Sequence, residues 1–88
     1  MPIDVHMKID KHTSDRRHLT YTLIKGMLES RESYSVEISM AYEGNFESAL
    51  ARDVSDDVTA CERLLRLLSD MEVEPCHLYD ILEDILPI

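Results

Sequence analysis

Residues 34–42 read Tyr-Ser-Val-Glu-Ile-Ser-Met-Ala-Tyr, in which large apolar side chains alternate with polar or small ones without a break. Successive side chains of a strand point to opposite faces, so this run predicts a strand over residues 34–43 with one buried face. The Gly44-Asn45 pair that follows is typical of a hairpin turn and predicts a return strand over residues 46–53. The stretch therefore predicts an antiparallel sheet.

Two pairing registers of this hairpin are open. A two-residue loop would place Ala49 and Ala51 on the same face as the large apolar side chains of residues 34–42. A three-residue loop would instead bury Phe46 and Leu50 there. We favour the three-residue loop, because burying a Phe and a Leu contributes roughly 3–6 kcal/mol. With the shorter loop, Phe46 and Leu50 would lie on the opposite face and form a candidate contact patch.

Two more strands are predicted before this hairpin. Residues 3–9 alternate apolar and polar side chains, and residues 18–28 begin with the same period. Ile24 then breaks the alternation, and Gly26 lies inside the run. Together these two residues predict a bulge in the second strand.

The last third of the chain has helical periodicity. A helix over residues 56–70 is predicted to be capped by Ser55, and a second helix over residues 75–86 begins at Pro75, which suits a first helical position. Apolar residues at three- and four-residue spacing form the predicted buried stripes: Val58, Cys61, Leu64, Leu65, Leu68 and Met71 in the first helix, and Leu78, Ile81, Leu82 and Ile85 in the second.

This order of elements predicts an α+β fold, with an antiparallel meander of three to four strands followed by two helices packed on one face. Eighty-eight residues support one hydrophobic core, so we expect a single domain over residues 1–88. The 44% apolar and 31% charged content is ordinary for a globular protein.

Charge and composition exclude several function classes. The net charge of −9 is concentrated in residues 45–88, which carry three Arg against eleven acidic residues. A phosphate backbone would be repelled by that half, so we expect no nucleic-acid partner. No apolar run is long enough for a membrane helix, and the N-terminus lacks the pattern of a secretory signal. Two cysteines are too few for a disulfide scaffold, which predicts a cytoplasmic protein.

The predicted second helix carries residue types that can bind metals or transfer protons. Cys76, His77, Asp80, Glu83 and Asp84 lie along its polar side, and His77, Asp80 and Asp84 recur at helical spacing. No further Cys/His pair with ligand spacing occurs elsewhere in the chain. The competing interpretation, which we favour, is a solvated helix face with no metal and no catalytic residue.

Other candidates give weaker signals. His6, His12 and His18 recur every six residues, which matches neither a helix nor a strand, so we interpret the spacing as coincidence. Cys61 lies on an apolar stripe and is predicted to be a buried hydrophobe. No phosphate-binding loop, nucleophile elbow, zinc-protease helix or dinucleotide fingerprint occurs, so we expect neither a cofactor nor an enzyme.

Four segments resemble a family of short bacterial proteins of unknown function from Gram-positive anaerobes. They are Tyr34-Ser-Val-Glu-Ile, Asp53-Val-Ser-Asp56, Leu64-Leu-Arg-Leu-Leu68 and the run from Val73 to Asp84. The resemblance covers roughly residues 18–86, and its most specific part is Pro75–Asp84. It implies a small intracellular protein and supplies no reaction, substrate or cofactor. Family members place Ser or Thr before the proline, where this chain has Glu74.

The expected function is a non-catalytic interaction or regulatory module with an unknown protein partner. Because a sheet edge can pair with another chain, self-association into a homodimer is one form that this module can take. Candidate interaction residues are Phe46, Leu50, Glu83 and Asp84. One alternative is a metal- or thiol-dependent activity on the last helix, and another is an acidic mimic that binds a basic protein surface.

Overall fold

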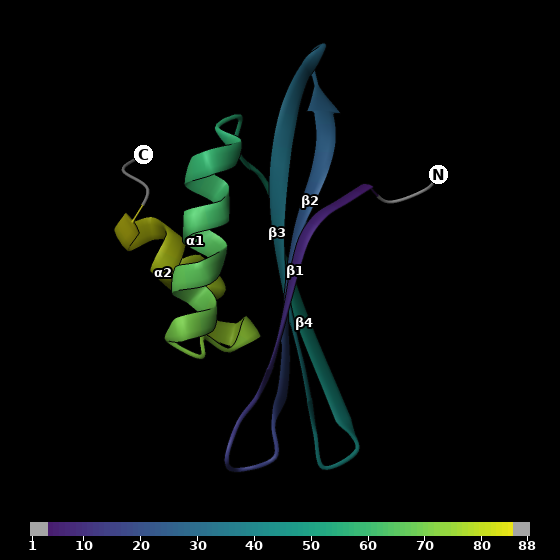
Figure 1. Cartoon of the computed structure of the whole chain (residues 1–88), viewed down its shortest axis with the longest axis vertical. Coiled ribbons are helices and arrows are strands. Elements are labelled where there is room, and N and C mark those ends of the chain that lie inside the picture. Colours follow the sequence, from purple (N-terminus) through teal and green to yellow (C-terminus); the bar gives the residue numbers. More distant parts are fainter. Residues whose placement is uncertain (1–3, 86–88) are drawn as a thin grey trace.

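The computed structural model describes residues 4–85 and shows a four-stranded antiparallel sheet followed by two helices (Figure 1). The strands follow one another in the order β1-β2-β3-β4, and both helices cover the same face of the sheet. This α+β meander confirms the predicted fold class. The elements are β1 (Asp4–His12), β2 (His18–Leu28), β3 (Arg31–Tyr42), β4 (Asn45–Ser55), α1 (Val58–Asp70), the 3-10 turn η1 (Pro75–His77) and α2 (Leu78–Ile85).

Several element bounds differ from those predicted. β1 runs to His12 rather than residue 9, because its polar end stays paired with β2 up to the His12–His18 pair. The predicted start of the first strand at residue 3 and the predicted end of the second helix at residue 86 lie outside the described residues.

The core lies between the sheet and the helices. Alternate side chains of the two central strands point into it, and small Ala51 is the core residue that β4 contributes. α1 packs over β1 and β2, while η1 and α2 pack over β4. The core residues are Leu19, Tyr21, Leu23, Tyr34, Val36, Ile38, Ala51, Cys61, Leu64, Leu65, Leu68, Val73, Leu78 and Leu82.

The favoured register of the second hairpin is wrong. Tyr42 pairs with Asn45, so the loop is the two-residue pair Glu43-Gly44, and both loop residues have positive φ as a type I′ turn requires. The loop lies one residue earlier than Gly44-Asn45. Ala49 and Ala51 therefore face the core, where their small side chains let η1 and α2 approach β4.

The predicted bulge lies in the neighbouring strand. β2 pairs with β3 without interruption, whereas the register with β1 shifts between the Val5–Ile24 and Met7–Leu23 pairs. The extra residue is His6, whose ring contacts the Glu62 carboxylate at 2.8 Å from Nε2. Because Glu62 belongs to α1, the bulge gives β1 a polar contact with the helix layer.

The first helix begins two residues later than predicted. Asp57, not Ser55, is its N-cap: the Asp57 carboxylate accepts the Ala60 N–H, and Ser55 accepts the Asp57 N–H instead. The buried stripe is as predicted from Cys61 to Leu68, but Met71 is exposed because the helix has ended at Asp70. Neither helix within residues 4–85 has the length and apolarity needed to cross a membrane.

The link between the helices is held by contacts with β2 and with the turn before it. The Tyr21 hydroxyl donates to the Val73 carbonyl at 2.9 Å, and the Arg17 guanidinium binds the Glu74 carboxylate at 2.9 Å. Glu74 precedes Pro75 and makes no capping bond to η1. Its carboxylate instead ties the start of η1 to the turn between β1 and β2, which fixes where the last helix meets the sheet.

Candidate interaction surface

β4 forms one edge of the sheet, and the turn before it determines which of its backbone groups are unpaired. The two-residue turn makes Tyr42 and Asn45 a hydrogen-bonded pair, and antiparallel pairs alternate from there between bonded and non-bonded. Phe46, Ser48 and Leu50 therefore direct their N–H and C=O groups away from β3. The Leu50 carbonyl accepts a hydrogen bond from the Tyr79 hydroxyl, as this alternation requires.

The side chains of the same residues lie on the face of the sheet that the helices leave open. Phe46 pairs with Ala41 and Leu50 pairs with Glu37, both on the face opposite the core. Phe46 is 70% exposed and Leu50 is half-buried. Phe46 and Leu50 thus share the open face, as expected for the shorter loop, and they lie along a strand edge that pairs with no other strand of the described sheet.

The opposite edge of the sheet, formed by β1, carries charged residues and a bulge. β1 carries Lys8, Asp10 and Lys11 and is interrupted by the bulge at His6. Hydrogen bonds from Thr20 and His18 hold the pKa of Asp10 below its ordinary value, so this carboxylate stays charged at neutral pH. Charges and bulges are the usual devices that prevent a strand edge from pairing with another chain.

A cleft of about 420 Å³ lies between β4 and the start of the last helix. It is lined by Glu47, Ser48 and Ala49 of β4 and by Pro75, Cys76 and Tyr79. Cys76 is an exposed free thiol at this place. The cleft opens beside the unpaired edge, so side chains of an added strand on the helix side of the sheet have room there.

The candidate metal-binding residues of the last helix are divided between two elements. Cys76 and His77 lie in η1, while Asp80, Glu83 and Asp84 are exposed on α2. Among residues 4–85, no three His, Cys, Asp or Glu side chains are close enough together to hold a metal ion. Glu83 and Asp84 belong to the helix layer, so they do not share a surface with Phe46 and Leu50 on the open face.

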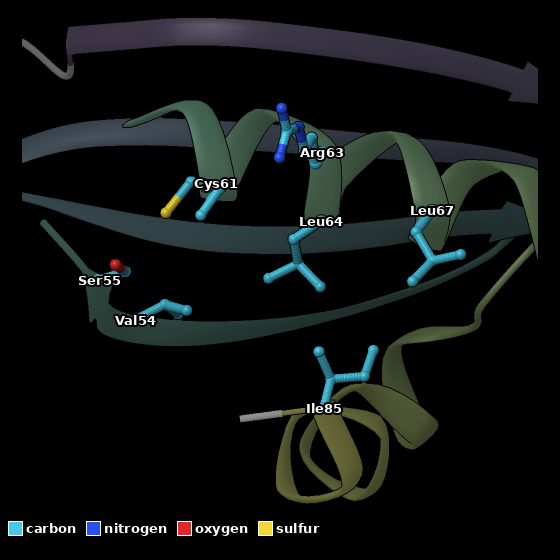
Figure 2. A pocket seen from close by; sticks show the side chains of 8 residues that line it. Val54, Ser55, Cys61, Arg63, Leu64, Leu67 and Ile85 are labelled. Atoms are coloured by element: carbon cyan, nitrogen blue, oxygen red, sulfur yellow. The ribbon is translucent and has the colours of Figure 1, made fainter. Parts of the chain in front are cut away.

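An apolar groove, absent from the predicted sites, lies between α1, α2 and the end of β4 (Figure 2). Its volume is about 290 Å³, and Leu64 and Leu67 of α1 point across it toward Ile85 of α2. Cys61 also lines the groove, and burial raises the pKa of its thiol, so the thiol stays protonated at neutral pH. The sequence signal that could reveal this groove is Leu67, an apolar residue of α1 that lies outside the buried stripe and is 42% exposed.

The three evenly spaced histidines have local partners. His12 and His18 are paired across the first hairpin, and their rings stack with centroids 4.2 Å apart. His18 also contacts Asp10 at 3.1 Å from Nε2 to Oδ1. His6 lies apart from them, against Glu62 and in a T-shaped contact with the Tyr34 ring. The spacing therefore reflects two structural roles and no common site.

Comparisons with known proteins identify a family but do not indicate an activity. No curated protein and no solved structure matches the chain. One family profile, described as "Family of unknown function (DUF6514)", matches residues 3–87. Because this match covers almost the whole chain, the protein belongs to that family of unknown function.

Proposed function

We propose that this protein is a non-catalytic interaction module that binds another polypeptide by strand addition to the edge of β4. The observation that carries the proposal is the mostly uncharged edge at Phe46, Ser48 and Leu50, which no strand of the described sheet pairs, with Phe46 exposed beside it. Of these outward backbone groups, the Leu50 carbonyl already accepts the Tyr79 hydroxyl. Strand addition uses backbone hydrogen bonds for affinity and alternate side chains for specificity. The edge of β4 supplies the backbone hydrogen bonds, and the Phe46–Leu50 patch supplies the side chains for specificity.

The remaining features of the chain fit such a role. Membership of a family of unknown function names no reaction. The titratable residues of the last helix are exposed, and within residues 4–85 they form no cluster of three that could hold a metal ion. A free buried Cys61 and a free exposed Cys76 suit the reducing cytoplasm, where we place the protein. The Pro75–Asp84 run, which resembles proteins of Gram-positive anaerobes, supports a bacterial origin.

Site-specific photo-crosslinking in the producing cell tests this proposal. Phe46 is replaced by a photoreactive phenylalanine analogue, and the matched control places the same analogue at Met27, which is 66% exposed in a different hairpin. We expect a discrete protein adduct from position 46 and none from position 27.

A proline variant adds a second control. Ser48→Pro removes an N–H that points away from β3, so it blocks strand addition without breaking the sheet. The adduct from position 46 should disappear in this background. Equal adducts from positions 46 and 27, or an adduct that survives Ser48→Pro, would contradict strand addition at β4.

A further inference from the structure

We propose that the polypeptide added to β4 is a second copy of the same chain, paired antiparallel about a two-fold axis through Ser48. This inference rests on the proposed function and specifies its partner. A two-fold axis requires the edge to be complementary to itself, so that each residue meets a suitable partner when the strand is reversed. The segment from Asn45 to Ala51 has this property.

The register centred on Ser48 matches side chains by type. It places Phe46 opposite Leu50 of the second copy, and symmetry repeats this apolar pair on the other side of the axis. Both pairs lie on the open face of the sheet. Glu47, the one charged residue within Asn45–Ala51, then lies opposite Ala49 of the second copy, so no like charges meet in this segment.

Neighbouring registers are worse on the same criteria. An axis through Glu47 would place two carboxylates directly opposite each other, which is destabilising. An axis through Ala49 would place Phe46 opposite Arg52 and Leu50 opposite Ser48, so both apolar pairs are lost. The side chains therefore select the axis through Ser48.

The surroundings of the edge accommodate a second strand. The Leu50 carbonyl oxygen has two lone pairs, so it can accept an N–H of the added strand while it keeps the Tyr79 hydroxyl. Glu47 and Ala49 of the second copy would face the cleft of about 420 Å³ beside Cys76 and Tyr79. A paired segment this short buries little area, so the dimer is weak and depends on concentration.

Cysteine cross-linking tests the register. In a Cys76→Ser background, Ser48→Cys places two thiols opposite each other with Cα atoms about 5.5 Å apart, within the distance that a disulfide spans. Ala49→Cys is the matched control, because in this register its own copies are diagonal, roughly 7–8 Å apart. Cys61 is buried and unchanged in both.

We expect Ser48→Cys to form disulfide-linked dimers under mild oxidation and Ala49→Cys to form few. Mixing Ala49→Cys with Glu47→Cys should restore the cross-link, since these two positions are opposite. Cross-linking of Ala49→Cys with itself as efficient as that of Ser48→Cys would overturn the register.

Sedimentation of the wild-type protein from roughly 1 µM to 1 mM tests the second copy itself. We expect the average mass to rise toward that of a dimer, and Phe46→Glu to lower the association constant at least tenfold. Met27→Glu, at a similarly exposed residue of another hairpin, should leave association unchanged. A strict monomer throughout this range would exclude the homodimer, while the photo-crosslinking at Phe46 would still decide whether β4 binds another protein.

Discussion

A hydrogen bond from one buried side chain connects the sheet to the helix layer. The Tyr21 side chain is fully buried in the core, and its hydroxyl bonds the Val73 carbonyl between the two helices. Burial raises the pKa of Tyr21 to about 12. The neutral phenol is therefore part of the folded structure, and its ionisation is coupled to unfolding.

This coupling predicts a loss of stability in alkali. Between pH 10 and pH 12 the unfolded chain releases the Tyr21 proton while the folded protein keeps it, so the free energy of unfolding falls by about 2–3 kcal/mol. Tyr21→Phe should remove this part of the pH dependence, while Tyr34, whose pKa burial also raises, keeps its own part.

Urea denaturation at several pH values between 9 and 12 measures the effect. At neutral pH, Tyr21→Phe should cost about 1–3 kcal/mol, because the buried Val73 carbonyl loses its donor. An unchanged alkaline slope in the variant would show that Tyr21 is not the titrating group.

At the scale of single strands and helices, local sequence patterns predict most elements but not the register of β4. The alternation of residues 34–42 and the stripe of α1 are local patterns, and they predict the sheet, the helix order and the core face. The predicted register of β4 is wrong, because η1 and α2 occupy the core side of β4 and pack against its small side chains there. The alternation of side chains within one strand does not predict the contact between the helices and β4.

The candidate surface was predictable only in part for the same reason. The sequence predicts a patch of Phe46 and Leu50 in one of two registers, but it does not predict that Tyr79 contacts Leu50. Tyr79 reaches β4 from 29 positions further along the chain. Its hydrogen bond to Leu50 depends on how η1 and α2 pack against β4, and no periodic pattern in the sequence predicts that packing.

The backbone alternation along β4 predicts different outcomes for two neighbouring prolines. Ser48→Pro should cost less than about 1 kcal/mol, because the Ser48 N–H has no partner in the sheet. Ala49→Pro should cost roughly 3 kcal/mol or more, since it removes a hydrogen bond to β3. Thermal and urea unfolding of both variants measures this, and equal costs would mean that the alternation is assigned wrongly.

At the scale of the whole molecule, the two edges of the sheet have opposite chemistry. β1 is charged and bulged, and a helix contact ties it down through His6 and Glu62. β4 presents a regular, mostly uncharged segment that ends at the irregular pairing near Asp53. In Figure 1 the helices cover one face of the sheet only. Phe46 lies on the other face and belongs to the edge strand β4. This asymmetry is the basis of the proposed pairing.

Residue-resolved amide hydrogen exchange, measured by NMR at low and at high protein concentration, tests the pairing of β4 most directly. We predict that the N–H groups of Phe46, Ser48 and Leu50 exchange markedly more slowly at high concentration, because each gains or is shielded by an inter-chain hydrogen bond. Lys8 and Asp10 on the β1 edge should exchange at the same rate in both samples. Equal exchange of the three β4 amides at both concentrations, or protection that appears at β1 instead, would contradict the account.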